Sequence, residues 1–424
     1  MNGTSRIIPV DKTLLHVNEI AKEIGLTRIA DITYMDKLYI PNYSSVLPGT
    51  EDYIWVYSGK GPTKQHAKTS AIMESIERYS SLPRSYTKKF VTGTYNELKK
   101  SYSILHPYEV IEPLSFDFQD DMFMDYVHGF DIINNEDILV PAGIALFRYN
   151  PHSPCINPFA FQHTNGLASG NVLEEAVCHA LAEVIERDAI SLAQLRASAI
   201  PFHILHNVFN NLQRQGYPVK PFSKDMFQDD YTIFSDVLVS EKDYHPITKL
   251  IKKFEKFNIK LIIKDVTTNI KIPTFNVACV EWISHDYGYL AEGYGTHPDK
   301  RIALLRALTE VSQTRVANIQ GARDDLRKIK YNDNNTDDKN AWQFMPSKKT
   351  INFSEIITYQ NEDILDDINL IVEYLKEAGL KKAIIVDLTN PNIKIPVVRA
   401  IIPGLETFMI SKSIMGWRAR GFYK

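Results

Sequence analysis

One arrangement of residues occurs three times in this chain and restricts the folds that the chain can adopt. Each copy has an amphipathic helix, a β-branched strand ending in Asp-x-Thr, a short turn, and an Ile-Pro pair that opens a second strand. Helices alternating with short strand pairs predict a mixed α/β fold with repeated helix-strand-strand units. The expected helices are near 15–24, 248–257 and 368–378, the first strands at 26–33, 261–267 and 383–389, and the Ile-Pro pairs at 40–41, 272–273 and 395–396.

The Asp residue that ends each first strand has a simple structural interpretation. Asp31, Asp265 and Asp387 are each followed two residues later by Thr. An Asp side chain at such a position accepts hydrogen bonds from the backbone of the turn that follows it. We therefore interpret these three residues as turn caps and the repeated units as scaffold.

A second repeat carries charge. Residues 70–78 align without gaps on 179–187, and five of the nine columns are identical, among them one Ala, two Glu and one Arg. Residues 306–315 form a looser third copy, in which Gln313 replaces the second Glu and Arg315 is displaced by one position. At 100° per residue, the carboxylates fall on one face of each helix and the apolar residues on the other.

The simplest interpretation of any single acidic helix is a solvated surface, because exposed ion pairs are common and weak. Repetition of the same columns makes that interpretation less satisfactory. If the helices face one another, their carboxylates repel and raise their own pKa values, and a hard divalent cation such as Mg²⁺ relieves the repulsion. The neighbouring Arg side chains suit phosphate, so the pattern predicts a nucleoside triphosphate site.

Several other classes of protein are disfavoured. The chain has no P-loop, no protein-kinase motif set and no Gly-x-Ser-x-Gly. Its formal charge of −3, from 48 Lys plus Arg and 51 Asp plus Glu, argues against a general nucleic-acid binder. Three dispersed cysteines without Cys-x-x-Cys disfavour a structural zinc or iron–sulfur site and fit a reducing compartment. Without an apolar signal region or a run of about 18 apolar residues, a cytoplasmic protein with no membrane span is expected.

Taken together, these segments resemble the YcaO family. The resemblance rests on 59–61 with 70–78, on 165–171 running into 175–188, on 306–315 with 321–325, and on 396–399 with 403–406. It implies a YcaO-type fold with three acidic helices around an ATP site. It also implies an enzyme that uses ATP and Mg²⁺ to phosphorylate the oxygen of a peptide carbonyl while a nucleophile adds to the carbon. A Cys, Ser or Thr side chain as nucleophile gives an azoline, and external sulfide gives a thioamide.

The resemblance also assigns residues, although it leaves the catalytic base open. The Mg²⁺ ligands that it implies are Glu74, Glu77, Glu183 and Glu186. The ATP-binding residues that it implies are Lys37, Ser44, Ser70, Arg78, Asn171, Arg187, Gln313 and Arg315. Further candidates on the same helices are Glu175, His179 and Glu310.

The branch of the family follows from what the chain lacks. It shows no Pro-rich tail and no room for a fused leader-binding domain, features of many azoline-forming members. We therefore expect a thioamide-forming enzyme that acts alone or with a TfuA-like partner and takes sulfur from sulfide or a persulfide. The nearest likeness is to members that convert a glycine of the methyl-coenzyme M reductase α subunit to thioglycine. An azoline-forming cyclodehydratase and a non-catalytic ATP-binding accessory protein remain as alternatives.

The domain organisation is expected to be simple. The strand units and acidic helices alternate closely, so we expect one domain over 1–424 with a core at about 27–406. A polar stretch at 323–350 predicts a mobile loop. By analogy with the family, a homodimer is expected.

Overall fold

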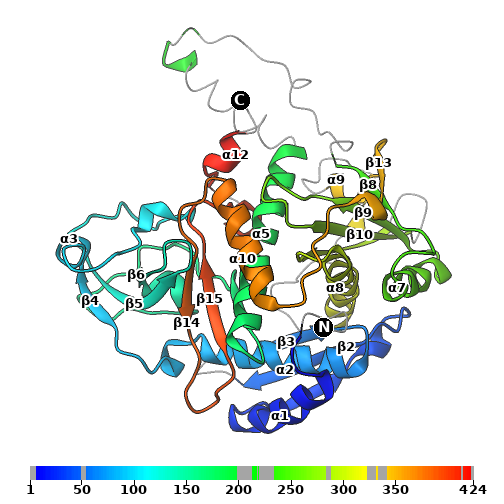
Figure 1. Cartoon of the computed structure of the whole chain (residues 1–424), viewed down its shortest axis with the longest axis horizontal. Coiled ribbons are helices and arrows are strands. Elements are labelled where there is room, and N and C mark those ends of the chain that lie inside the picture. The colour runs from blue at the N-terminus through cyan, green and yellow to red at the C-terminus, as the bar shows by residue number, and fades with distance from the viewer. Residues whose placement is uncertain are drawn as a thin grey trace.

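A computed structural model describes residues 6–48, 54–197, 213–216, 218, 234–282, 288–321, 331–332, 341–411 and 414–421. Within these residues the strands form three sheets, which lie at the bottom, right and left of Figure 1. Helices pack against all three sheets, so the mixed α/β class predicted from the repeats is confirmed.

The first sheet is built from the N-terminal part of the chain. Its antiparallel order is β1 (Arg28–Asp31), β2 (Asn42–Pro48) and β3 (Ile54–Lys60). Helix α1 (Val10–Glu23) precedes the sheet, and helix α2 (Lys64–Ser80) follows it and packs on β2 and β3.

The second sheet has the order β12-β11-β10-β9-β8-β13, and its central strands are antiparallel. Helix α7 (His245–Lys256) precedes β9, and helix α8 (Lys300–Gln320) packs on β10 and β11. The strands span β8 (Asp236–Leu238), β9 (Lys260–Asp265), β10 (Thr274–Trp282), β11 (Gly288–Thr296), β12 (Tyr331–Asn332) and β13 (Thr350–Asn352).

The third sheet has the order β4-β5-β14-β15-β7, with β6 paired to β5. Helix α5 (Leu173–Ala197) packs on β7 and β15, and helix α10 (Ile364–Glu377) packs on α5. The strands span β4 (Val91–Thr94), β5 (Phe123–Asp131), β6 (Glu136–Pro141), β7 (Leu167–Ser169), β14 (Ile384–Asp387) and β15 (Val397–Ile401). The shorter helices are α3 (Tyr95–Leu98), α4 (Ala142–Ala145), α9 (Ala341–Phe344), α11 (Phe408–Ser411) and α12 (Trp417–Gly421).

The predicted repeat is part of a larger unit. In the first two copies a third antiparallel strand follows the hairpin and leads into an acidic helix, giving α1-β1-β2-β3-α2 and α7-β9-β10-β11-α8. In the third copy, β14 pairs with β15, and β15 pairs with β7, which lies far earlier in the chain and leads into α5. The third unit is therefore assembled from two distant segments in permuted order, so each acidic helix follows the third strand of its own unit.

The turns of the three units share their details. Asp31, Asp265 and Asp387 each accept a hydrogen bond from the backbone N–H two residues later, at 3.0, 3.0 and 2.9 Å. This confirms their predicted capping role. The residue just before each Ile-Pro pair has a left-handed backbone, with φ of 48° at Tyr39, 61° at Lys271 and 59° at Lys394.

Close backbone packing explains the Ala that the acidic helices share. Ala71, Ala180 and Ala307 occupy equivalent positions and are fully buried. A Cβ atom at Gly59 of β3 would lie 2.1 Å from the Ala71 backbone nitrogen, and one at Gly295 of β11 would lie 2.7 Å from that of Ala307. Larger side chains at these contacts would lift α2 and α8 from their sheets.

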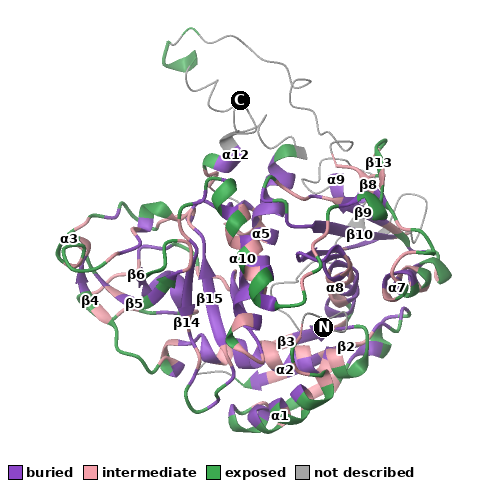
Figure 2. Ribbon diagram, in the orientation of Figure 1, coloured by how far each residue is buried: buried purple, intermediate pink, exposed green. Residues whose placement is uncertain are grey.

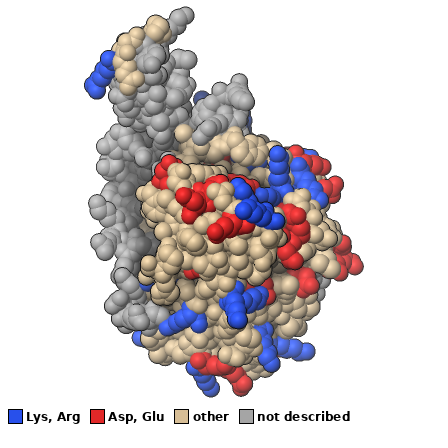
Figure 3. Space-filling view, turned by 90° about the vertical axis from the view of Figure 1, so that its left-hand side faces the viewer, with Lys and Arg blue, Asp and Glu red and all other residues tan. Residues whose placement is uncertain are grey.

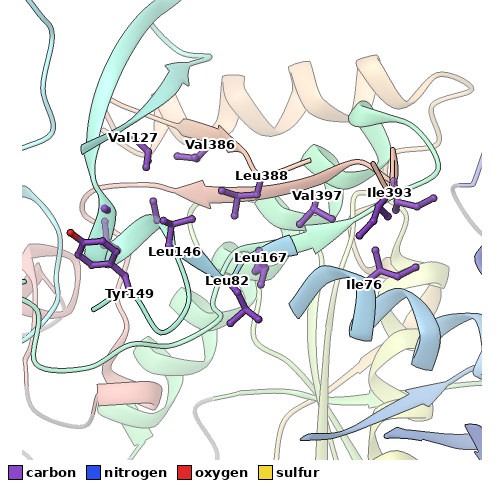
Figure 4. Packing of buried hydrophobic residues seen from close by; sticks show 14 of the residues in the cluster. Ile76, Leu82, Val127, Leu146, Tyr149, Leu167, Val386, Leu388, Ile393 and Val397 are labelled. Atoms are coloured by element: carbon purple, nitrogen blue, oxygen red, sulfur yellow. The ribbon is translucent and has the colours of Figure 1, made fainter. Parts of the chain in front are cut away.

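The hydrophobic core continues from one sheet to the next. Its largest cluster joins Ile76 of α2 to Leu167 of β7, Val386 of β14 and Val397 of β15, as Figure 4 shows. A second cluster joins Leu38, just before β2, to the second sheet. Figure 2 shows buried residues along α5, β14 and β15 at the centre of the molecule.

The polar stretch 323–350, the absence of a membrane span and the surface charge were also predicted from the sequence. The stretch 323–350 lies largely outside the described residues, but α9 near its end buries Trp342. No described helix is long and apolar enough to cross a lipid bilayer. On the face drawn in Figure 3, basic side chains lie among acidic and uncharged ones and do not form one continuous patch.

Candidate active site

The three acidic helices meet around one cavity. Besides its own sheet, each helix contacts a strand of another sheet: α2 contacts β7, α5 contacts β11, and α8 contacts β3. The cavity between them has a volume of about 1660 Å³. It is large enough for a nucleotide together with part of a second substrate.

Most of the residues predicted for the site line this cavity. The four predicted metal ligands are among them, two from α2 and two from α5. The lining contains these predicted residues: Ser70, Glu74, Glu77, Arg78, Asn171, His179, Glu183, Glu186, Arg187, Glu310 and Gln313. The convergence that the helix pattern suggested is therefore present in the fold, and it includes all three acidic helices.

Lys37 and Arg315 are not part of the cavity lining. Arg315 is buried and binds both carboxylate oxygens of Asp36, at 2.9 and 3.0 Å, and Glu281 at 2.7 Å. Lys37 pairs with the same Glu281. These contacts join the first sheet to α8 and β10. In this structure the Lys37 and Arg315 side chains are therefore both held in ion pairs with carboxylates.

Ser44 and Glu175 also lie outside the lining. Ser44 is buried on β2 and accepts a hydrogen bond from Gln320 at 3.3 Å. Glu175 is buried on α5 and accepts hydrogen bonds from the Ile7 backbone at 2.6 Å and from the Asn171 side chain at 2.8 Å. Glu175 thus holds the N-terminal segment and Asn171 at the edge of the cavity.

The carboxylates in the cavity are electrostatically strained. Burial raises the pKa of Glu77 well above its usual range, and neighbouring Glu183 and Glu74 add to the rise, against the opposing effect of Arg78. Burial raises the pKa of Glu186 to about 7, and Glu310 and Glu183 contribute to the rise. Carboxyl groups with raised pKa values are stabilised by an added cation.

Two arginines, Arg78 and Arg187, lie among the carboxylates of the cavity. Arg78 lies 3.4 Å from Glu74 and 3.3 Å from Glu77, yet its buried Nη1 atom makes no hydrogen bond of good geometry. Arg187 is close to Glu186 and Glu183, which raise its pKa. Oxygen-rich ligands beside guanidinium donors fit Mg²⁺ together with phosphate, so the residues present suit the group that the sequence pattern implies.

Lys60 and Arg306 are among the lining residues that the predicted site did not include. Lys60, at the end of β3, forms an ion pair with Glu310 of α8. Arg306 of α8 occupies the column of Ser70 and His179 and donates to the Thr296 carbonyl at 3.0 Å. Both were detectable from the sequence, because Lys60 lies between two glycines and Arg306 begins the third acidic copy.

His179 also lines the cavity. Burial together with Arg306 and Arg6 lowers its pKa well below the usual value, so its imidazole is neutral at pH 7.

Cys178, His297 and Asp367 form a buried group with ligand atoms within 4.8 Å of one another. His297 Nδ1 accepts the Asp299 backbone N–H at 2.9 Å, which places the ring proton on Nε2. This nitrogen lies 4.0 Å from Asp367. It therefore presents a proton, not a lone pair, to the other two residues, and this arrangement does not suit a metal ion.

Comparisons with known proteins place this geometry in context. The profile of the YcaO family, described as a cyclodehydratase that binds ATP and Mg²⁺, matches residues 58–406. An uncharacterized protein of Methanothermobacter thermautotrophicus is 31% identical, covering 96% of this chain and 97% of that protein. A Rhizobium leguminosarum bv. trifolii protein, described as lying in the tfuA 3′ region, is 24% identical over 98% of this chain and 92% of its own length.

Solved structures share the fold at low sequence identity. YcaO from Methanopyrus kandleri, bound with AMPPCP and Mg²⁺, has a TM-score of 0.70 and 21% identity, covering 98% of this chain and 96% of that one. A heterocyclase in complex with substrate and cofactor has a TM-score of 0.73 and 20% identity, covering 95% of this chain but only 53% of that one.

Proposed function

Because the chain belongs to the YcaO family of ATP- and Mg²⁺-binding enzymes that modify peptide backbones, we propose that it converts a backbone amide to a thioamide. The observation that carries the proposal is the convergence of glutamates from three repeated helices on one cavity that also holds guanidinium groups. Such a cavity can neutralise the charge of a triphosphate and of the transition state for phosphoryl transfer.

The proposal gives each part of the cavity a role. Glu74 and Glu77 of α2, with Glu183 and Glu186 of α5, would hold Mg²⁺, whose charge would offset their mutual repulsion. Arg78, whose Nη1 makes no hydrogen bond of good geometry, would bind phosphate oxygens. Further phosphate or sugar contacts are proposed for Ser70, Asn171, Arg187 and Gln313, all of which line the cavity.

The remaining predicted residues have a less direct role in the proposal. Lys37, Ser44 and Arg315 would contribute only if the ion pairs and hydrogen bonds that now hold them rearranged when nucleotide binds. Glu310 is paired with Lys60, so a metal ion that bound Glu310 would release Lys60 toward phosphate.

The proposed reaction balances without an oxidant. The sulfur of hydrosulfide adds to the amide carbon, and the carbonyl oxygen attacks the γ-phosphorus of ATP, with ADP as leaving group. The C–O bond then breaks, phosphate leaves with the original oxygen, and the proton of the bound S–H is lost to water or to a base. The net change is amide, hydrosulfide and ATP to thioamide, ADP and phosphate.

A partner and a substrate follow from the same proposal. The tfuA neighbourhood in the name of the Rhizobium relative supports a TfuA-like partner that delivers sulfur. The resemblance described above points to a glycine in the α subunit of methyl-coenzyme M reductase as the modified residue. A homodimer remains an expectation by analogy with the family.

The test supplies peptide, ATP, Mg²⁺ and sulfide, with and without a TfuA-like protein, and measures ADP release and peptide mass. The proposal predicts peptide-dependent ADP release and a mass increase that corresponds to replacement of one oxygen by sulfur. Loss of water from the peptide would instead identify an azoline-forming cyclodehydratase, as the family description suggests. Nucleotide binding without peptide-dependent ADP release would identify an accessory protein.

A further inference from the structure

A short segment borders the main cavity just before the first helix. Residues 6–9, here called the N-terminal strap, run from a contact with Glu175 of α5 to the start of α1, and all four line the cavity. Helix α1 is anchored in the core, because Val17 and Ile20 belong to the same cluster as Ile76 of α2. The strap therefore connects the α2 side of the cavity to the α5 side, and these two helices supply the four predicted metal ligands.

The N-terminal strap lies between the cavity and the solvent. None of its residues is buried, and Ile7 is 56% exposed although it also lines the cavity. Neither Ile7 nor Ile8 belongs to the core clusters that hold α1 and α5. A segment with few buried apolar contacts has low local stability, so the position of the strap depends on its polar anchors.

A buried carboxylate anchors the strap. Glu175 is only 2% exposed, and its Oε1 atom accepts the Ile7 backbone N–H at 2.6 Å. Its Oε2 atom accepts a hydrogen bond from Arg6 Nη1 at 3.1 Å. Hydrogen bonds to an ionised group are about twice as strong as neutral ones. Opening of the strap would take two partners from a buried carboxylate, so the contacts favour the closed position.

The same carboxylate holds a residue for which a nucleotide contact is proposed. Glu175 Oε2 also accepts hydrogen bonds from the Asn171 backbone N–H at 2.9 Å and from Asn171 Nδ2 at 2.8 Å. The Oδ1 atom of Asn171 accepts a hydrogen bond from Thr13 Oγ1 of α1 at 2.8 Å. The strap, the first turn of α1 and Asn171 thus form one hydrogen-bonded network around Glu175.

We propose that the N-terminal strap is a gate for the nucleotide and that Glu175 is its latch. Nucleotide enters and leaves when the strap releases Glu175, and the strap encloses it when the two hydrogen bonds form again. The gate rests on the proposed ATP function, whereas the latch stands on the contacts alone. Glu175 is a positioning residue, because it does not line the cavity.

A gate differs in its kinetics from a fixed wall that only contacts the nucleotide. A closed gate slows both entry and exit, so a weaker latch raises the association and dissociation rate constants by the same factor and leaves the Kd almost unchanged. Loss of a direct contact raises the dissociation rate constant alone and therefore raises the Kd. Measurement of both rate constants separates the two roles.

The gate is tested by stopped-flow binding of the fluorescent analogue mant-AMPPNP, with Mg²⁺, to the full chain. Glu175→Gln should raise both rate constants about tenfold, because it removes the charge from both latch hydrogen bonds. Arg6→Gln leaves the Ile7 bond and the Asn171 contacts in place and should raise both rate constants about threefold. The matched control Glu174→Gln removes the neighbouring carboxylate in the first turn of α5 and should change neither rate constant.

Two kinetic results would overturn the gate. Unchanged rate constants in Glu175→Gln and Arg6→Gln would mean that the strap does not limit exchange of the nucleotide. A rise in the dissociation rate constant alone would mean that the strap contacts the nucleotide without gating it. If Glu175→Gln does not fold, Arg6→Gln decides between these outcomes, because it leaves the buried carboxylate in place.

The latch is tested separately by hydrogen exchange of the nucleotide-free protein, measured by mass spectrometry on the N-terminal peptide. Glu175→Gln should speed exchange in the strap about tenfold, because the Ile7 N–H loses a charged acceptor, and Glu174→Gln should not. Equal exchange in the wild type and Glu175→Gln would overturn the latch whether or not the protein binds ATP. Faster exchange in Glu175→Gln together with a wild type that binds no nucleotide would support the latch and contradict both the gate and the proposed function.

Discussion

Replacing Glu186 by Gln should stabilise the protein without nucleotide and abolish its response to Mg²⁺ and ATP. Burial and neighbouring Glu310 and Glu183 raise the pKa of Glu186 from an ordinary 4.5 to about 7. Since a tenfold change in proton affinity is worth about 1.4 kcal/mol, the ionised form is destabilised in the folded state by about 3 to 4 kcal/mol. An isosteric amide removes this cost because it carries no charge.

The sign of the effect depends on pH. Below about pH 4.5 the carboxyl is protonated in both the folded and the unfolded chain, and the wild type loses no stability from it. Between about pH 4.5 and 7 the unfolded chain ionises first, so the free energy of unfolding of the wild type falls. Above pH 7 the full cost is present, and the stability gained in Glu186→Gln should reach its maximum there.

The assay is urea unfolding at pH 5 and pH 8 in the presence of a chelator, repeated with Mg²⁺ and an ATP analogue. At pH 8 without ligand, Glu186→Gln should be more stable than the wild type by about 3 kcal/mol, and at pH 5 by much less. Mg²⁺ and the analogue should stabilise the wild type but not the variant. The matched control is Glu19→Gln, which removes a carboxylate from the exposed face of α1 and should change neither measurement.

Two results would refute this reasoning. A variant no more stable than the wild type at pH 8 would mean that the cavity does not strain Glu186. Equal stabilisation of both proteins by Mg²⁺ and the analogue would mean that Glu186 does not contribute to metal binding.

Three further predictions follow from the site and the scaffold. Glu74→Gln should lower ATP turnover, measured as ADP release, by about 100-fold or more. The melting temperature should change little, because the side chain faces the cavity and not the core. Turnover like that of the wild type would exclude Glu74 as a metal ligand. Gly59→Ala should cost about 1–3 kcal/mol in unfolding free energy, because the new Cβ would lie 2.1 Å from the α2 backbone. In the control Gly93→Ala, the new Cβ meets only the Leu98 side chain at 3.1 Å, so the loss should be smaller. Equal losses would show that close packing on β3 is unimportant. Asp265→Ala should cost about 1 kcal/mol in unfolding free energy, because the hydrogen bond from the Thr267 backbone N–H is lost. Asp265→Asn keeps an acceptor and should retain most of the stability in the same denaturation assay. Equal destabilisation of both variants would count against the capping role.

The local features of the fold were predictable from the sequence. The Asp turns and the order of helices and strands follow from short-range patterns, and the structure confirms them, although the first strands end at the Asp residues, two residues earlier than expected. The convergence of the acidic faces was also inferable, because the same columns recur in three helices. The assembly of the third unit from α10, β14, β15 and the much earlier β7 was not predictable, since it depends on strand pairing between residues far apart in the chain.

The sequence predicts which helix residues line the site, but not the long-range pairings around it. Residues on the acidic faces line the cavity because helix periodicity fixes which side chains share a face. Lys37 and Arg315, which the family resemblance implied, are held by Asp36 and Glu281 outside the lining, and no local pattern reveals those pairings. Glu112 and Arg399 meet through a three-dimensional network with His163, and only the fold brings them together.

The central claim is that three repeated acidic helices form one site for Mg²⁺ and ATP. A crystal structure of this chain with a non-hydrolysable ATP analogue and Mg²⁺ tests it most directly. The account predicts metal bound by glutamates of α2 and α5, with the phosphates beside Arg78 and near Gln313 of α8. Nucleotide bound elsewhere, or in this cavity without metal contact to Glu74, Glu77, Glu183 or Glu186, would contradict it.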